Sequence, residues 1–208
     1  MAYSSDQIEV MNSIIKRYPR SRSAIMPLLH YVQSLAGYVT NEGIEEIAKL
    51  LELETAEVTA VATFYTQYKR RPVGEYHVGV CTNTLCAVMG GDAIFAALKD
   101  HLGVENDGVT ADGKVSLEHI ECNAACDYAP VVMANWEFYD NQNVESAKDL
   151  VDSMRQGNPI PPTRGPKSLP TWKENSAVLA GINDGRANEG VQAGEPTLLG
   201  LKLAKEGK

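Results

Sequence analysis

C-T-N-T-L-C at residues 81–86 and C-N-A-A-C at residues 122–126 contain all four cysteines of this 208-residue chain. Each motif offers two thiols from one short loop, and 35 residues separate the two loops. Four cysteine thiolates are the ligand set of a [2Fe–2S] cluster or of a structural zinc ion. Four thiols also form two disulfides where the compartment is oxidising. The stretch from Cys81 to Cys126 is therefore a candidate metal or redox site.

The gaps within the two motifs favour the cluster over the other two interpretations. Zinc sites most often use a two-residue gap, although gaps of up to four residues occur. Disulfides need an oxidising compartment, and the N-terminus M-A-Y-S-S-D-Q-I-E-V has neither a charged region nor an apolar region of a secretory signal. We therefore expect the chain in the reducing cytoplasm. A Rieske centre would need histidine ligands, and no histidine lies in either loop: His30, His77, His101 and His119.

Composition excludes several classes of function. The chain is 44% hydrophobic and 22% charged, which is ordinary for a globular protein, and its apolar runs are too short for a membrane span. The net charge of −8 disfavours nucleic-acid binding, because no basic field is available to displace counterions from phosphates. The charge is uneven: residues 1–156 carry 12 Lys and Arg against 22 Asp and Glu, whereas residues 157–208 carry 7 against 5.

Residues 1–71 predict a helical bundle. Apolar residues recur at three-to-four spacing over about 5–18, 23–35, 42–51 and 55–68. Ser5 or Asp6 and Thr55 are candidate helix N-caps, and Gly37 suits a helix end.

Residues 72–157 predict a small α/β domain that presents the cysteines. E-Y-H-V-G-V at 75–80 predicts a strand that leads into Cys81, and residues 114–121 predict a strand that leads into Cys122. The remaining expected elements are a strand near 108–111, a hairpin over 131–139, and helices over about 92–102 and 144–156. Because both cysteine loops follow strands, we expect them to meet at one end of the sheet.

Residues 158–208 predict an extended or disordered tail. They contain six of the ten prolines and no apolar periodicity. The only expected anchors are Trp172 with Leu169 and the run Leu198–Leu203, and they allow the tail to order along a partner.

The two cysteine motifs resemble those of the thioredoxin-like [2Fe–2S] ferredoxin family, in particular the 24 kDa-type subunits of bacterial NADH:quinone oxidoreductase (respiratory complex I). The family pattern C-x4-C followed by C-x3-C-x3-P is completed here by Pro130. R-S-A-I-M-P-L-L-H-Y-V-Q at 22–33 and V-A-T-F-Y-T at 61–66 also match, so the resemblance covers about residues 8–156. One departure is Asn123-Ala124, where the family often has Leu-Gly. An alanine at that position is expected to need a negative φ.

The resemblance implies an α+β fold with a helical bundle at 1–71, a thioredoxin-like domain at 72–157 and an extended tail at 158–208. It implies one [2Fe–2S] cluster, held by Cys81, Cys86, Cys122 and Cys126. It implies electron transfer within complex I, where the partner subunit binds FMN and NADH and other peripheral-arm subunits lie nearby. The complex would place the chain on the cytoplasmic side of the inner membrane. No independent catalytic site is expected, since G-x-G-x-x-G and a nucleophile–base pair are missing from the sequence. The alternatives are the equivalent subunit of an NAD-linked hydrogenase or formate dehydrogenase, or a zinc-stapled interaction module.

Overall fold

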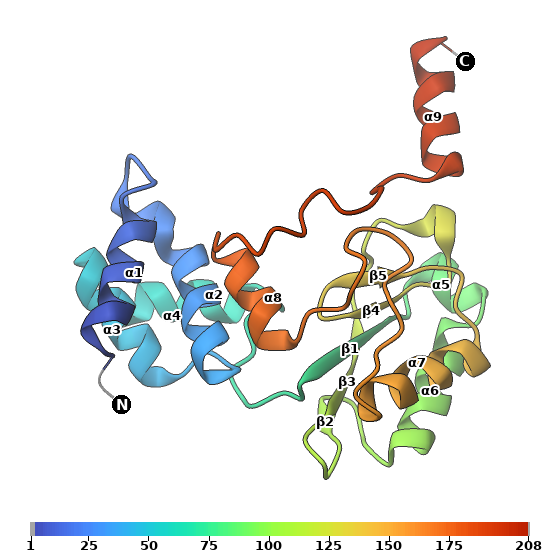
Figure 1. Cartoon of the computed structure of the whole chain (residues 1–208), viewed down its shortest axis with the longest axis horizontal. Coiled ribbons are helices and arrows are strands. Elements are labelled where there is room, and N and C mark those ends of the chain that lie inside the picture. The colour runs from blue at the N-terminus through green and yellow to red at the C-terminus, as the bar shows by residue number, and fades with distance from the viewer. Residues whose placement is uncertain (1–2, 208) are drawn as a thin grey trace. The chain divides into compact units, whose positions relative to one another are not determined.

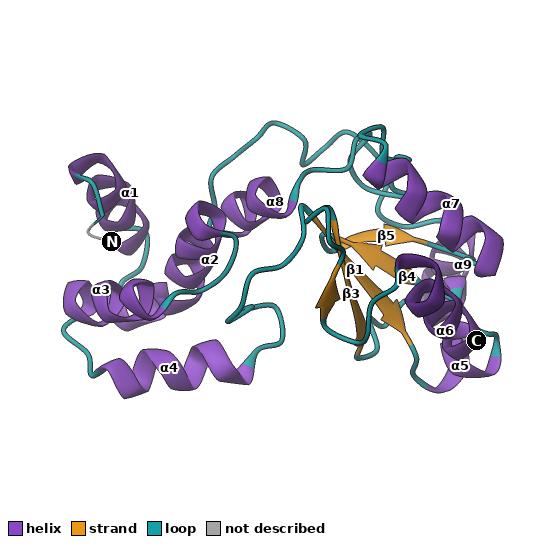
Figure 2. Cartoon of the chain, turned by 90° about the horizontal axis from the view of Figure 1, so that it is seen from below, coloured by secondary structure: helices purple, strands orange, loops and turns teal. Residues whose placement is uncertain are grey.

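The computed structural model describes residues 3–207 and divides into two compact units (Figures 1 and 2). The helical unit comprises Met1–Val73 and Pro170–Asp184, and the sheet unit comprises Gly74–Leu169 and Gly185–Lys208. The chain passes from the first unit to the second at Val73–Gly74, close to the expected start of the second domain at residue 72. Each unit is thus assembled from two separate stretches of chain.

Four helices form the body of the helical unit: α1 (Ser5–Ile15), α2 (Ile25–Ala36), α3 (Asn41–Leu51) and α4 (Thr55–Phe64), with a 3₁₀ turn η1 (Ser21–Ala24) before α2. Ser4 caps α1 in a capping box with Gln7, and Gly37 ends α2 with a φ of 86°, where a side chain would be strained. The predicted helical bundle is confirmed. Its fully buried core includes Met11, Ile14, Leu28, Leu29, Val32, Ile47 and Val58.

Helix α4 is shorter than the sequence predicts, ending at Phe64 instead of near Tyr68. Tyr65 is already extended, with φ −97° and ψ 123°. Tyr68 is buried, and its hydroxyl donates a hydrogen bond to the carbonyl of Met26 at 3.1 Å. The chain therefore turns back toward α2, because burying the Tyr68 ring outweighs one more turn of helix.

The expectation of an extended tail is wrong for residues 172–179. They form helix α8 (Trp172–Leu179), which packs on α2 as part of the helical unit (Figure 1). Trp172 is 2% exposed, and its indole N–H donates to the carbonyl of Gly37 at 2.7 Å. The Gln33 side-chain amide donates to the Ser176 hydroxyl at 3.3 Å. A proline-rich segment therefore closes the helical core through one large buried side chain.

The sheet unit contains a five-stranded mixed sheet in the order β2-β3-β1-β4-β5. The strands are β1 (Tyr76–Cys81), β2 (Gly108–Val109), β3 (Val115–Ile120), β4 (Val132–Ala134) and β5 (Glu137–Tyr139). Strands β1 and β3 run parallel, and the other pairs are antiparallel. This arrangement confirms the predicted thioredoxin-like domain.

Helices α6 (Gly91–Leu102) and α7 (Val144–Arg155) lie side by side against one face of the sheet (Figure 2). As predicted, Tyr76, Val78 and Val80 share the face that these helices cover. Since side chains alternate along a strand, the intervening residues, His77 and Gly79 among them, lie on the opposite face. The core of the unit includes Val115, Leu117, Ile94, Leu98, Leu150, Val151 and Met154.

The last element is helix α9 (Glu195–Lys205), a second departure from the expected extended tail. It belongs to the sheet unit and has no buried residue. Pro196 lies in its first turn, where the missing N–H costs little. Over residues 3–207, no helix has both the length and the hydropathy to cross a membrane.

Candidate metal centre

The first cysteine pair lies where β1 passes into a short helix, α5 (Thr84–Val88), that the sequence did not predict. Cys81 is the last residue of β1, Cys86 lies within α5, and both are buried. The backbone N–H of Cys81 donates to the carbonyl of Val131 at 3.1 Å. The Asn83 side chain donates to the carbonyl of Ile120 at 2.9 Å, so the first loop is fastened to the end of β3.

The second pair lies just beyond β3 and is exposed: Cys122 follows the strand, and Cys126 opens the 3₁₀ turn η2 (Cys126–Tyr128). Their sulfur atoms are 3.8 Å apart. Two thiolates about 2.3 Å from one tetrahedral metal ion are about 3.8 Å from each other. The second pair is therefore already spaced to hold one ion.

Ala124 contradicts the expectation of a negative φ in the second loop. Its φ is 53°, in the left-handed region that glycine favours. This conformation lets the Ala124 backbone N–H donate to Cys122 Sγ at 3.4 Å. The loop thus keeps a glycine-like backbone in spite of the Ala124 methyl group. The same strained backbone conformation directs the Ala124 N–H at the sulfur.

The two pairs converge, as expected from strands β1 and β3. Cys81 at the end of β1 is in register with Ile120, two residues before Cys122. Burial raises the pKa of the Cys86 thiol to about 11, and both Cys81 and Cys126 add to the rise. The pKa of the Cys126 thiol is raised mainly by its hydrogen bond with Cys122, and Cys81 again contributes. A bound cation would reverse these shifts by stabilising the thiolates.

All four cysteines are free thiols, so the structure contains no disulfide at these positions. Soft thiolate donors suit iron–sulfur clusters and zinc. Among residues 3–207, no group of three or more His, Cys, Asp and Glu side chains is placed so that it could hold one metal ion. The donor chemistry and the 3.8 Å spacing nonetheless fit a metal centre that takes two thiolates per ion.

Gly91, the first residue of α6, is a site residue that the sequence reasoning missed. A Cβ atom on Gly91 would lie 2.4 Å from the carbonyl oxygen of Cys81 and 2.9 Å from that of Cys86. Both neighbours are backbone atoms, which cannot move aside without moving the cysteines. Only glycine lets helix α6 begin this close to the first loop.

Gly91→Ala is expected to displace the first loop, lower iron content by more than half and destabilise the sheet unit by about 1–3 kcal/mol, as overpacking does. Iron analysis and thermal unfolding measure the two effects. Gly200→Ala is the matched control, because nothing lies within 4 Å of a Cβ at that position. Iron content equal to that of the parent protein in the Gly91→Ala variant would contradict this role.

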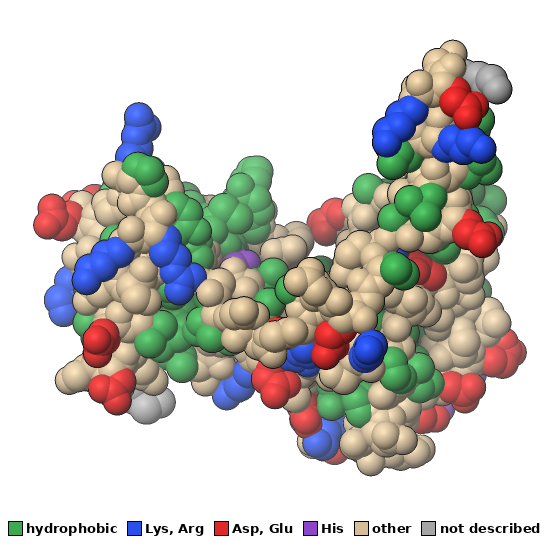
Figure 3. Space-filling view, turned by 45° about the horizontal axis from the view of Figure 1, so that its top comes forward, with side chains coloured by type: hydrophobic (Ala, Val, Ile, Leu, Met, Phe, Trp, Pro, Cys, Tyr) green, Lys and Arg blue, Asp and Glu red, His purple; other side chains and the backbone are tan. Residues whose placement is uncertain are grey.

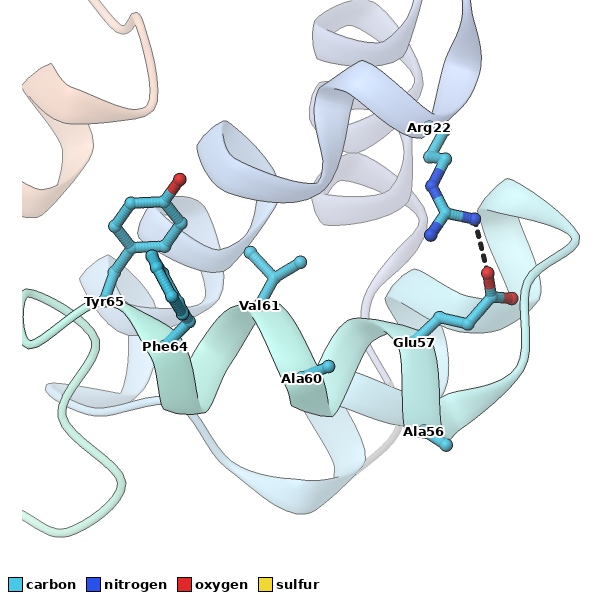
Figure 4. A pocket seen from close by; sticks show the side chains of 7 residues that line it. All are labelled: Arg22, Ala56, Glu57, Ala60, Val61, Phe64 and Tyr65. Carbon is cyan, nitrogen blue, oxygen red and sulfur yellow. Dashed lines mark hydrogen bonds and ion pairs between the residues drawn. The ribbon is translucent and has the colours of Figure 1, made fainter.

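A hollow of about 540 Å³ lies on the helical unit between η1 and α4 (Figure 4). It is lined by Arg22, Ala56, Glu57, Ala60, Val61, Phe64 and Tyr65. The Arg22 guanidinium forms an ion pair with Glu57, and this hydrogen bond lowers the pKa of the Glu57 carboxyl. The hollow lies in the helical unit, whereas all four cysteines lie in the sheet unit.

A thioredoxin-like sheet with two pairs of free thiols near the ends of neighbouring parallel strands defines a thioredoxin-like protein with a candidate thiolate metal site. Residues 11–155 match the family model described as thioredoxin-like [2Fe-2S] ferredoxin. The chain is 60% identical over 93% of its length to the E subunit of the NADH-quinone oxidoreductase of Mycobacterium tuberculosis strain H37Rv, and covers 77% of that protein. The corresponding E subunit of Rickettsia bellii is 38% identical over 74% of this chain and 94% of its own length. The chain therefore belongs to the family of NADH-quinone oxidoreductase E subunits, which are thioredoxin-like [2Fe–2S] ferredoxins and bind a [2Fe–2S] cluster.

A solved structure of an NAD⁺-reducing [NiFe]-hydrogenase shares the fold, with a TM-score of 0.57 and 19% identity. The match covers 65% of this chain and 23% of the hydrogenase chain, so this protein spans about a quarter of that chain's length. At this identity the likeness concerns the fold alone.

Proposed function

We propose that the chain binds one [2Fe–2S] cluster through Cys81, Cys86, Cys122 and Cys126. The cluster would accept single electrons from the FMN of a partner subunit that oxidises NADH. The chain is a subunit of the NADH-quinone oxidoreductase complex, and its part in that enzyme is electron transfer. The observation that carries the proposed ligand set is the placement of the two thiol pairs: one begins at the end of β1 and the other just beyond β3, its parallel neighbour. The second pair is already at a metal-binding separation.

Each thiol pair would hold one iron: Cys81 with Cys86, and Cys122 with Cys126. When bound, the cluster supplies a one-electron acceptor, which flavin needs because NADH delivers two electrons together as a hydride. The protein positions the ligands. β1 and β3 fix Cys81 and the approach to Cys122, and the Ala124 N–H donates to the Cys122 sulfur. Hydrogen bonds to ligand sulfur are among the groups that tune a cluster's potential.

Groups with opposite effects on the cluster's reduction potential surround this site. The Ala124 N–H favours the reduced, more negative cluster, whereas Asp127, next to Cys126, disfavours an added electron, as does the acidic body of residues 1–156. We expect the charges to dominate, giving a midpoint near the plant-type ferredoxin value of about −400 mV rather than in the Rieske range. A redox titration followed by EPR measures this, and a positive midpoint would contradict the expectation.

The partner would bind both FMN and NADH, and further peripheral-arm subunits would contact this chain. In that assembly the chain lies on the cytoplasmic side of the inner membrane without entering the bilayer. Purification from the native host at native expression level, with identification of the accompanying proteins, tests the assembly. Recovery of hydrogenase or formate dehydrogenase subunits instead would replace NADH:quinone oxidoreductase as the host complex.

Zinc is the second candidate for the same thiols, because a pair 3.8 Å apart fits a zinc ion as well as an iron. The visible spectrum of the purified protein separates the two. A red-brown protein with charge-transfer bands and an EPR signal on reduction supports the cluster. A colourless protein with bound zinc would make the chain an interaction module.

A further inference from the structure

Helix α9 presents its apolar side to solvent. Its four leucines, Leu198, Leu199, Leu201 and Leu203, are 53%, 56%, 52% and 39% exposed. At about 100° per residue they fall within an arc of roughly 200°. The small residues Thr197, Gly200 and Ala204 occupy the remaining arc. Figure 3 shows hydrophobic side chains along this projecting helix, with lysines near its outer end.

The base of α9 is fastened to the second cysteine loop. The Thr197 hydroxyl donates to a carboxylate oxygen of Asp127 at 2.5 Å. Gly194, the residue before the helix, lies so close to Tyr128 that a Cβ would be 1.8 Å from the Tyr128 hydroxyl oxygen. Asp127 and Tyr128 directly follow Cys126. The helix therefore begins beside the exposed cysteine pair, with Thr197 toward the loop.

Nothing within the sheet unit accounts for the leucines. An isolated helix of eleven residues is marginal in water, and most helices in proteins are stabilised by packing an apolar face. Here every residue of α9 is exposed, and the four leucines are uncovered. The family match ends at residue 155, so α9 is not part of the fold that the family model describes.

We propose that α9 is a docking element whose leucine face enters an apolar groove of the flavin-bearing subunit that reduces the cluster. This rests on the proposed function, because the electron donor must approach the exposed Cys122–Cys126 pair. A subunit bound over that cysteine pair would contact the second cysteine loop, where α9 begins. Helix α9 is about 16 Å long, so it would extend along that subunit. The helix would bind in the helix-in-groove mode. Lys202 and Lys205 in its last turn suit an acidic rim at the far end of the groove.

A lipid surface is the competing occupant of an exposed amphipathic helix. Membrane-surface helices carry a strongly charged polar face rich in Lys and Arg. The side of α9 opposite the leucines instead holds Thr197, Gly200 and Ala204 and has no charged residue. The two lysines and two glutamates of the helix and its C-cap fall between the leucines and balance in charge: Lys202, Lys205, Glu195 and Glu206. The charge pattern thus favours a protein groove.

Leu198→Gln combined with Leu201→Gln tests the docking face, since glutamine keeps helix propensity and adds no charge. The full chain with its cluster is titrated with the purified FMN-containing NADH-oxidising subunit of the same organism. We expect the Kd to rise at least about tenfold, as the loss of two buried leucine contacts implies, with an unchanged visible spectrum. Leu179→Gln with Val191→Gln is the control, because these residues are 38% and 73% exposed outside α9, and its Kd should change less than about twofold.

Four results would overturn the docking role. If the Kd of the α9 variant equals that of the parent protein while the parent binds the flavoprotein, docking fails and the proposed function stands. If the cluster-loaded parent does not bind the flavoprotein, both fail together. If the α9 variant loses sedimentation with anionic phospholipid vesicles but keeps its Kd, the helix is a lipid contact. A variant that loses its visible absorbance would assign α9 to the stability of the cysteine loop instead.

Discussion

Cys86→Ser is expected to remove most of the iron and the visible absorbance of the purified protein, together with its EPR signal on reduction. Cys86 is 3% exposed, so a serine placed there is enclosed and cannot be replaced by a neighbouring thiol. A hydroxyl is a harder and less acidic donor than a thiol, and iron–sulfur clusters are held by thiolates. The iron that Cys81 and Cys86 would share loses half of its protein ligands.

Ala87→Ser is the matched control for this substitution. It places a hydroxyl on the adjacent residue of α5 and removes no ligand, so iron content and spectrum should stay at the parent level. The same loss is expected for Cys81→Ser, Cys122→Ser and Cys126→Ser. An unaltered absorbance and EPR signal in the Cys86→Ser protein would remove Cys86 from the ligand set.

Trp172→Ala is expected to lower the free energy of unfolding of the helical unit by about 3–5 kcal/mol, the usual cost of truncating a buried tryptophan. The substitution leaves a cavity against α2 and strips the Gly37 carbonyl of its 2.7 Å hydrogen bond. Such a loss is a large share of the stability of a small domain. Circular dichroism during thermal or denaturant unfolding measures it, and the cluster spectrum in the sheet unit serves as the internal reference.

Two further variants separate packing from hydrogen bonding at this position. Trp172→Phe keeps an aromatic ring and should cost about 1–3 kcal/mol, since it leaves the Gly37 carbonyl unsatisfied. Leu179→Ala, on the same helix but 38% exposed, should cost less than about 1 kcal/mol. An unchanged transition in Trp172→Ala would show that α8 adds nothing to the helical unit. Truncation after Gly157 would remove both α8 and α9. It is therefore expected to destabilise the helical unit in addition to removing the proposed docking helix.

The regular elements follow from local patterns that the sequence displays. Tyr76, Val78 and Val80 alternate along β1 and share one buried face, as a period of two requires. Apolar residues at three-to-four spacing located the helices, with Gly37 at the end of α2. The two cysteine motifs were expected at strand ends, and the parallel pairing of β1 with β3 brings those ends together. Their role as ligands stays a prediction.

The missed features depend on partners distant in sequence or on backbone angles. Helix α8 has a single large buried side chain, Trp172, so the sequence shows no apolar periodicity that would predict a helix there. The face of α2 that contacts Trp172 is distant in sequence. The available signal was Thr171-Trp-Lys-Glu174, a capping box that the structure confirms. Ala124 was expected to avoid positive φ because side-chain sterics disfavour it, yet the cysteine loop imposes a φ of 53°. The tight contact at Gly91 depends on where α6 begins relative to the first loop.

The division of the helical unit between Met1–Val73 and Pro170–Asp184 has a consequence for synthesis on the ribosome. The first segment to be translated cannot complete its core until Trp172 has emerged. At about 5–20 residues per second, the intervening stretch of the sheet unit takes roughly 5–20 s to make. During that interval the nascent helices leave the α2 surface around Gln33 and Gly37 open to water and chaperones. All five strands of the sheet are made before Trp172 emerges, so the sheet can form before the helices made first can complete their core.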